Sequence, residues 1–270
     1  DCVIAQCPAE LDDLNRYYTA QLGNVRIVPS GVNVRRFHPV ARSSARASLG
    51  LPQGEQVVGY IGRLVPRKGI ETLLRGFAQL VAERPRAPLR LMIVGGECRD
   101  PGQDPSPDMD RLRRLVRELH IDRQVWLVGK RQPDELANYY GAADVLVSIP
   151  WYEPFGLTPL EAQACGRAFI GTAVGGITYT VQDGVTGLLI PPRDQQALVQ
   201  ALRTLLDNAD LRRRMGRAGR RRVEREFTWA RVAERTAAVY EAVLAGAKPV
   251  AVPPVQPIVP ALGAPVPLRD

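Results

Sequence analysis

The chain has 270 residues and a formal net charge of +8, from 36 Lys and Arg against 28 Asp and Glu. This length is enough for one large domain, or one domain with appendages, and the ordinary apolar and charged fractions are those of a globular protein. No apolar run reaches the length of about 18 residues that a membrane span requires.

The N-terminus and the cysteines both bear on the cellular compartment. Residues 1–13, DCVIAQCPAELDD, have no basic region and no initial Met, so we expect no signal peptide and expect the chain to be part of a longer protein. The four cysteines show no C-x-x-C pairing and no nearby His cluster. Zinc and a disulfide framework are therefore not expected, and a reduced cytoplasm fits best.

The centre of the chain alternates short apolar runs with segments of helical periodicity. The runs are rich in Val, Ile and Leu and mostly do not alternate with polar residues, a pattern typical of strands buried on both faces of a parallel sheet. The predicted strands are 57–64, 89–96, 125–129, 145–149, 168–172 and 187–190, and the predicted helices are 69–82, 108–119, 133–141, 158–165 and 194–207. This order predicts an α/β fold, a Rossmann-like doubly wound parallel sheet with helices on both faces. Such sheets bind ligands beyond the carboxyl ends of their strands.

Much of the positive charge lies in two segments, RLRRLVRELH at 111–120 and RRRMGRAGRRRVERE at 212–226. Both predict helices with a buried stripe of Leu, Met and Val and an outer face of Arg. A solvated face is the favoured interpretation, and a peripheral membrane contact through anionic lipid headgroups is the alternative. Nucleic acid is not expected as a partner, because aromatic residues are not interleaved with the basic ones.

Two further segments flank this core. Residues 1–24 carry a strand-like VIAQ and a helical stretch, and residues 227–246 predict a long amphipathic helix. Residues 248–270 are dominated by Pro, Ala and Val, so we expect an extended, disordered tail.

The loop after the first core strand, GRLVPRKG at 62–69, brings two cations to a helix N-terminus. Arg63 offers a bidentate fork and Lys68 a compact point charge, which together suit a diphosphate. The loop is neither G-x-G-x-x-G nor a Walker A motif. Two surface cations in an ordinary connection remain the alternative.

The next two loops could approach a ligand or simply turn the chain. Paired glycines at Gly95 and Gly96 would allow a close backbone approach. The loop GKRQPDEL at 129–136 could frame a planar base, with the stem of Lys130 or Arg131 over its face. A tight turn and a plain connection are the respective alternatives.

The fourth loop, WYEPFGLTPLE at 151–161, carries two carboxylates around a glycine turn. Thr158, Pro159 and Glu161 fit a capping box with Thr158 as N-cap, which would give Glu161 a structural role. Glu153 lies outside the helix at the end of a strand, where a carboxylate accepts hydrogen bonds from hydroxyl-rich ligands. The amides of residues 155–157 would point toward an anion at the helix start.

Several motifs, in order and spacing, resemble glycosyltransferase family 4, the retaining nucleotide-sugar enzymes of GT-B fold. They are PSGVNVRRFHP at 29–39, GRLVPRKG at 62–69, EPFGLTPLE at 153–161, the stretch from GGI at 175–177 to PPRD at 191–194, and the closing FTWARVAERTAAVYEAVL at 227–244. The resemblance covers about residues 1–246. It implies that 1–24 is the end of the acceptor-binding domain and hinge, 25–226 the donor-binding domain, 227–247 a crossover helix, and 248–270 the Pro-rich disordered tail.

The resemblance also implies roles for individual residues. Arg63 and Lys68 look like the cations that stabilise the leaving nucleotide, and Glu153 like the carboxylate that binds donor-sugar hydroxyls. Together these three form the expected catalytic set. The expected donor-binding set is Gly62, Gly95, Lys130, Arg131, Phe155, Gly156, Leu157 and Glu161, with Glu161 as the ribose ligand and Lys130 and Arg131 near the base. No cofactor or metal is expected, since positive side chains and helix ends replace Mg²⁺ in enzymes of this type.

The expected function is transfer of a hexose-type sugar from a nucleotide diphosphate sugar to the hydroxyl of a glycan, lipid or small-molecule acceptor. The acceptor-binding half is not recognisable in this sequence, so we expect little or no transfer by this chain without that half. One alternative is a non-catalytic nucleotide-sugar-binding module of the same ancestry. Another is a related enzyme such as a sugar-nucleotide epimerase.

Overall fold

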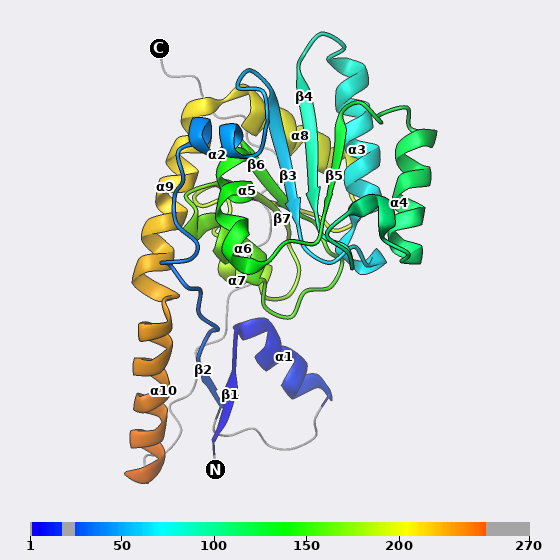
Figure 1. Cartoon of the computed structure of the whole chain (residues 1–270). Helices are drawn as coiled ribbons and strands as arrows, with labels where there is room; N and C mark the ends of the chain where they lie inside the picture. Colours follow the sequence, from blue (N-terminus) through cyan, green and yellow to red (C-terminus); the bar gives the residue numbers. More distant parts are fainter. Residues whose placement is uncertain (1, 18–24, 247–270) are drawn as a thin grey trace, which may run out of the picture.

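The computed structural model describes residues 2–17 and 25–246 (Figure 1). Its larger part is a six-stranded sheet, and its smaller part is a two-stranded parallel sheet of β1 (Val3–Ala5) and β2 (Val25–Ile27) with helix α1 (Pro8–Tyr17). β2 thus pairs with β1 and not with the large sheet, although residue 25 was taken as the start of the donor-binding domain. The domain limits inferred from the sequence stay predictions.

The large sheet is parallel throughout, and its order is β5-β4-β3-β6-β7-β8. Its strands are β3 (Gln56–Ile61), β4 (Leu89–Val94), β5 (Val125–Gly129), β6 (Val145–Ser148), β7 (Ala168–Thr172) and β8 (Leu188–Ile190). The chain winds outward in one direction from β3 and in the other from β6. The neighbours β3 and β6 therefore form the topological switch point of a doubly wound fold.

Helices cover both faces of this sheet (Figure 1). One face packs against α3 (Ile70–Glu83), α4 (Pro107–Glu118) and α8 (Gln195–Asp207). The other packs against α2 (Arg42–Ser48), α5 (Leu136–Ala142), α6 (Leu157–Ala164), α7 (Ile177–Thr180) and α9 (Ala209–Glu226). Short 3₁₀ turns η1 (Pro66–Lys68), η2 (Pro101–Gln103) and η3 (Pro133–Glu135) lie in the loops.

The strands are apolar on both sides because each contributes to two cores. In β3, Val58 and Tyr60 face one core while Val57 and Ile61 face the other. Side chains of a strand alternate between the two faces, so a sheet covered on both faces needs apolar residues at every position. The predicted fold class, a Rossmann-like doubly wound parallel sheet, is confirmed.

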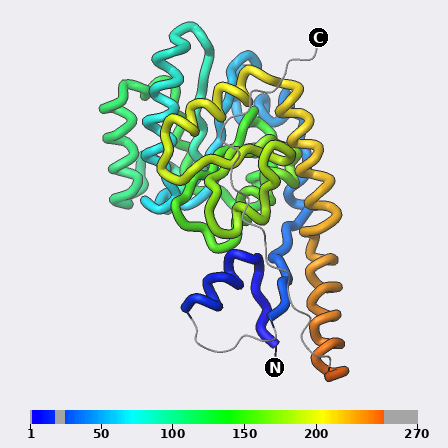
Figure 2. Tube along the Cα trace, turned by 180° about the vertical axis from the view of Figure 1, so that it is seen from behind, coloured from blue at the N-terminus to red at the C-terminus, as the bar shows by residue number. Residues whose placement is uncertain are grey.

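The last described helix, α10 (Trp229–Leu244), extends past the large sheet and runs along the β1–β2 unit (Figure 2). Its start is held by a hydrogen bond of 2.8 Å from the Val32 amide to the Phe227 carbonyl. Val239 is its one buried residue, and an apolar hollow of about 590 Å³ lies between α10 and β1. None of the helices in 2–17 and 25–246 is long and apolar enough to cross a membrane. The predicted tail at 248–270 lies outside the described residues.

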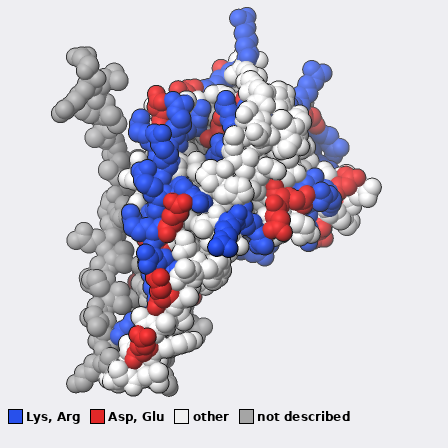
Figure 3. All heavy atoms as spheres, turned by 60° about the vertical axis from the view of Figure 1, so that its left-hand side comes forward, with Lys and Arg blue, Asp and Glu red and all other residues white. Residues whose placement is uncertain are grey.

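The expectation that the arginines of 212–226 all face outward is wrong in part. Lys and Arg do gather in a band over the α9 side of the molecule (Figure 3). Arg222, however, is only 7% exposed. Its guanidinium donates to the carbonyls of Thr180 at 2.7 Å and Tyr179 at 2.8 Å. An arginine that satisfies backbone carbonyls can occupy an interior position despite its charge.

The amino ends of β3 and β6 are joined by a buried carboxylate. One oxygen of Asp144 accepts from the Val57 amide at 2.8 Å and from the fully buried Arg46 at 2.8 Å. Arg46 also donates to the carbonyls of Ala142, Gln53 and Glu55. These contacts tie helix α2 to the segments that lead into the two central strands.

We therefore expect Asp144→Ala to lower the free energy of unfolding by about 3–5 kcal/mol, because it leaves the Arg46 charge buried without its partner. Urea unfolding followed by circular dichroism measures this loss. Asp207→Ala is the control, since it breaks an exposed pair with Arg84 and should cost no more than about 1 kcal/mol. Equal losses in the two variants would contradict the assignment.

Candidate active site at the switch point

The loops that follow β3, β4, β5 and β6 meet at the carboxyl edge of the large sheet. In a doubly wound sheet the crevice at the switch point is the usual place for a ligand. All of the residues predicted for the site lie in these loops or in the first turns of α6. The prediction placed them on several separate loops, and the parallel sheet brings those loops to one edge.

An ion pair between Lys68 and Glu153 bridges the switch point. Lys68 ends η1 after β3, Glu153 follows β6, and the Lys68 Nζ contacts the Glu153 Oε2. Both side chains are largely buried, with 13% and 14% of their surfaces exposed. Low exposure weakens solvent screening, so this contact is stronger than an ion pair on the open surface. The two residues sit where one ligand could contact both.

Backbone contacts hold these two loops together. The Trp151 amide donates to the Arg67 carbonyl at 3.0 Å, and the Arg67 guanidinium donates to the Tyr152 carbonyl at 2.9 Å. Gly69 has φ 74°, and a Cβ there would lie 2.2 Å from the Ile149 carbonyl oxygen. Only glycine allows this approach without a backbone shift. The position of Lys68 relative to Glu153 is thus set by the backbone.

The turn at Gly175 and Gly176 supports the Glu153 loop from the other side. The Gly176 amide donates to the Glu153 carbonyl at 3.0 Å. A Cβ on Gly175 would lie 2.0 Å from that carbonyl oxygen, and one on Gly176 would lie 2.2 Å from the Phe155 Cα. Both glycines therefore serve close packing of the 153–155 backbone. The sequence showed this glycine pair but not its partner.

Five of the predicted residues line one cavity of about 250 Å³. They come from the loops after β3, β4 and β5 and are Gly62, Arg63, Gly95, Lys130 and Arg131. Ile61, Val94 and Leu136 supply its apolar part. A cavity with an apolar wall and cations at one side can accept a flat ring that carries an anionic group.

The Gly95 backbone approaches its neighbouring loop closely. A Cβ on Gly95 would lie 2.0 Å from the Gly62 carbonyl oxygen, so glycine is needed there for packing. This contact accounts for the glycine at position 95 without any ligand. A role of Gly95 in donor binding stays a prediction.

Arg131 and Lys130 differ in how they are held. The Arg131 guanidinium donates to the Tyr139 hydroxyl at 2.8 Å and to the Arg99 carbonyl at 2.8 Å. Lys130 is exposed, and its backbone amide donates to the Cys98 carbonyl at 2.7 Å. Arg131 is therefore a fixed wall of the cavity, while the Lys130 side chain extends into solvent.

The capping box proposed for the fourth loop is wrong. α6 begins at Leu157 after Gly156, whose φ is 95°, and Thr158 lies within the first turn. The left-handed conformation of Gly156 lets the helix start before Thr158. The Glu161 carboxylate instead accepts from the Tyr140 hydroxyl of α5 at 2.6 Å. Burial raises the pKa of Glu161, an effect that the Tyr140 hydrogen bond opposes.

The remaining predicted residues surround the start of α6. Phe155 is buried in the core, Gly156 turns the chain, and Leu157 is 47% exposed. Glu153, unlike Arg63, opens on a second cavity of about 280 Å³ that also contains Tyr17 of α1. The expected donor residues are thus divided between two cavities and the start of α6, and the Lys68–Glu153 pair connects the loops after β3 and β6.

Sequence reasoning missed two tyrosines that position this site. The Tyr60 hydroxyl donates to the Arg63 carbonyl at 2.6 Å, and Tyr140 holds Glu161. Burial raises the pKa of both hydroxyls, so they remain neutral donors. Their strand and helix positions gave no signal beyond that of core residues. Within 2–17 and 25–246, no group of three or more His, Cys, Asp or Glu residues could hold a metal ion.

The strand order and the site geometry define the Rossmann-like class of α/β domains. The family model described as glycosyl transferases group 1 matches residues 41–222, and the chain belongs to this family. The expected Rossmann-like half of a GT-B glycosyltransferase is supported by solved neighbours. Sucrose-phosphate synthase from Thermosynechococcus elongatus superposes with a TM-score of 0.80 at 40% identity, covering 92% of this chain and 59% of that one.

Other relatives share the same segment. D-inositol 3-phosphate glycosyltransferase of Streptomyces avermitilis is 39% identical over 247 residues, covering 90% of this chain and 52% of the relative. The C-terminal domain of a glycosyl transferase group 1 family protein from Francisella tularensis has a TM-score of 0.63 at 24% identity, covering 74% of this chain and 100% of that one, and shows the fold alone. The chain spans about half the length of the curated relatives that it matches.

The raised pKa of Glu161 makes folding stability depend on pH. The folded protein holds this proton more tightly than the unfolded chain, whose carboxyl has an ordinary value of 4.5. The stabilisation is therefore complete below about pH 4.5 and is lost as the pH rises through the raised folded pKa. We expect Glu161→Gln to remove this loss, so that its melting temperature falls less between pH 4.5 and 7 than that of the unmodified chain.

Calorimetric melting at several pH values measures the effect. Glu118→Gln is the control, because Glu118 is an exposed residue at the end of α4. A pH profile of Glu161→Gln that coincides with those of the control and the unmodified chain would contradict the burial of an ionisable Glu161.

Proposed function

We propose that this chain forms the donor-binding side of a retaining glycosyltransferase, which transfers a hexose from a nucleotide diphosphate sugar to an acceptor hydroxyl. The observation that carries the proposal is the Lys68–Glu153 pair at the switch point. A cation that suits a diphosphate and a carboxylate that can accept hydrogen bonds from sugar hydroxyls lie next to each other there. The family membership and the relatives named glycosyltransferase support the same reaction class.

Each part of the donor has a matching group in the site. Lys68 and Arg63 would bind the diphosphate, helped by the amides of 155–157 at the start of α6. Glu153 would accept hydrogen bonds from sugar hydroxyls. Glu161, ionised once the ribose hydroxyls donate to it, would hold the ribose. The cavity of Arg131 and Leu136 would receive the base.

The proposed transfer proceeds on the face of the sugar that the diphosphate leaves. The bond between the anomeric carbon and the phosphate oxygen breaks while the acceptor oxygen bonds to that carbon. The departing phosphate oxygen takes the acceptor proton. Lys68 and Arg63 stabilise the negative charge that develops on the diphosphate, and this electrostatic stabilisation is the largest contribution such a site can make.

The acceptor side is proposed to belong to a second domain. The apolar hollow formed by β1 and α10, with Ile4, Val239 and Leu244 among its residues, supports a domain contact at that end. Large exposed apolar patches mark interaction surfaces. A glycan, a lipid or a small molecule could serve as the acceptor.

The first test is calorimetric titration of the chain with UDP, GDP and ADP. We expect one nucleotide to bind best and Lys68→Ala to weaken it by at least about tenfold, because a charge-assisted contact to phosphate is worth about 1.5–3 kcal/mol. Arg75→Ala is the control, since Arg75 is an exposed arginine on α3 that belongs to no part of the site. Failure of a folded chain to bind any of the three nucleotides would contradict the proposal.

Metal independence is proposed as a further property of this site. Lys68 and Arg63 supply the positive charge that Mg²⁺ provides elsewhere. We expect the affinity for the preferred nucleotide to be the same, within about twofold, in EDTA and in millimolar Mg²⁺, because the protein cations already neutralise the diphosphate. A strong gain in affinity on adding Mg²⁺ would contradict it.

A further inference from the structure

A separate cavity, rich in arginine, lies at the amino edge of the large sheet, away from the switch-point site. It has a volume of about 370 Å³ and is lined by Arg42 of α2, by Asp144 and Arg167 just before β6 and β7, and by Arg212 and Arg213 of α9. The site described above lies at the carboxyl ends of the strands. The parallel strands thus separate the two positions by the length of the sheet.

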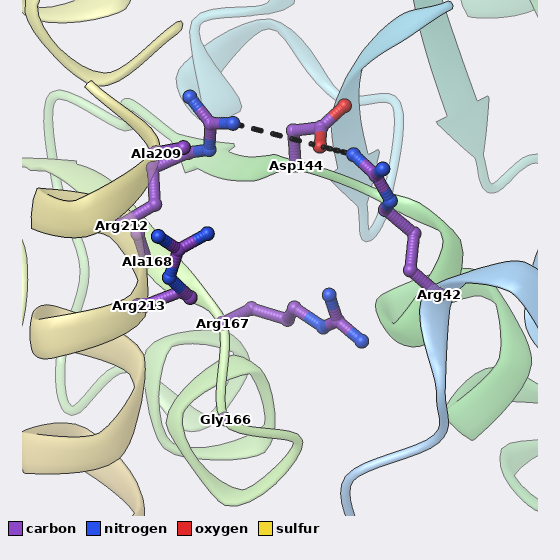
Figure 4. A pocket seen from close by; sticks show the side chains of 8 residues that line it. All are labelled: Arg42, Asp144, Gly166, Arg167, Ala168, Ala209, Arg212 and Arg213. Atoms are coloured by element: carbon purple, nitrogen blue, oxygen red, sulfur yellow. Dashed lines mark hydrogen bonds and ion pairs between the residues drawn. The ribbon is translucent and has the colours of Figure 1, made fainter. Parts of the chain in front are cut away.

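The guanidinium groups of the four arginines surround one open space, with Asp144 at its edge (Figure 4). Asp144 is already engaged, because it pairs with Arg42 at 2.9 Å and with Arg46 at 2.8 Å and lies 3.9 Å from Arg212. Arg213 pairs with Asp210. Four arginines and one carboxylate therefore line the cavity, and that carboxylate is shared with the buried Arg46, which leaves an excess of positive charge around the cavity.

Among the arginines that line the cavity, Arg167 is the one that pairs with no carboxylate of the described residues. It makes no ion pair within the described ranges, and its buried Nε has no hydrogen-bond partner there. One terminal nitrogen donates to the Val40 carbonyl at 2.6 Å. Burial lowers the pKa of Arg167. A buried donor left unsatisfied is destabilising, more so when it is charged, and an anion in the cavity would relieve this effect.

The backbone adds to the positive potential of the cavity. Ala209, the first residue of the 18-residue helix α9, lines it, and the N-terminus of a helix carries partial positive charge. Gly216 lets α9 pack tightly against the Arg167 loop, since a Cβ there would lie 2.1 Å from the Gly166 carbonyl oxygen. The arginines of α9 and of the β7 loop are therefore held close together.

We propose that this cavity binds a phosphate monoester, with Arg42, Arg167, Arg212 and Arg213 as its ligands. Guanidinium groups bind phosphate oxygens in a bidentate way, and the two negative charges of a phosphate monoester would compensate the excess positive charge. A volume of about 370 Å³ leaves room for a small organic group beside the phosphate. The phosphate could belong to a soluble metabolite or to a lipid headgroup, and the chemistry of recognition is the same. The site is separate from donor binding.

The test uses glycerol 3-phosphate as the soluble probe and vesicles of phosphatidylcholine with phosphatidic acid as the lipid probe. The chain carries Lys68→Gln throughout, which weakens phosphate binding at the other site. Amide NMR shifts of Gly166, Ala168 and Ala209 report on this cavity, and those of Gly62 and Gly95 report on the other. Vesicle sedimentation measures the lipid arm.

We expect saturable shifts at the cavity amides or sedimentation with the phosphatidic acid vesicles. The affinity for the probe that binds should fall by at least about tenfold in Arg42→Gln/Arg213→Gln, because two charge-assisted contacts are lost. Both side chains are partly exposed, with 49% and 63% of their surfaces accessible, so the fold should tolerate the double change. Arg75→Gln/Arg86→Gln is the control, because it removes the same charge from exposed positions outside the cavity.

Binding of glycerol 3-phosphate would identify a soluble phosphate monoester as the ligand. Sedimentation with the vesicles, in a chain that does not bind glycerol 3-phosphate, would identify a lipid headgroup. The proposal is overturned if a folded chain binds neither probe. It is also overturned if the cavity double variant and the control double variant lose affinity equally, since the effect would then be general surface charge.

Discussion

β3 and β6 lie side by side, with Val58 in register with Val145, and this pairing constrains the rest of the molecule. The chain winds outward from these two strands in opposite directions, and helices form the crossovers between successive strands. The chain leaves the carboxyl ends of β3 and β6 at neighbouring positions on the edge of the sheet. The loops that carry Lys68 and Glu153 must therefore meet there.

The two ends of this strand pair use charge in different ways. At the amino end, Asp144 is buried and accepts hydrogen bonds from Arg46 and the Val57 amide. Its charge therefore stabilises the packing of α2 against β3 and β6. At the carboxyl end, Lys68 and Glu153 contact each other beside cavities. Two charged residues that contact mainly each other can replace that contact with contacts to a ligand. Removal of one partner from a buried network instead leaves an uncompensated charge. The switch-point site thus lies at the opposite end of the strand pair from the buried Asp144–Arg46 network.

The net charge of +8 conceals several distinct environments for arginine. Arg46 and Arg222 are buried and donate to backbone carbonyl groups, and Arg46 also pairs with Asp144, whereas a band of cations over α9 faces solvent. Arg167 is intermediate, because it is mostly buried but only partly satisfied. The electrostatic consequence of each charge depends on its partners and its exposure, which residue counts do not contain.

The sequence by itself determined the six strands of the large sheet, most of its helices and their layering, because residues buried on both faces must be apolar along the whole strand. The short elements α2, α7 and β2 were not predicted. It also located Arg63, Lys68 and Glu153 in the loops that follow strands, and Glu161 in the helix after one of these loops. Only the tertiary structure decided that Gly175 and Gly176 pack on the Glu153 loop, that Glu161 is held by Tyr140, and that Arg42, Arg167 and Arg212 share a cavity. Thr158 shows the same limit at short range, since the φ of Gly156 moved the helix start. Periodicity is a local property of the chain, whereas these contacts join residues that only packing brings together.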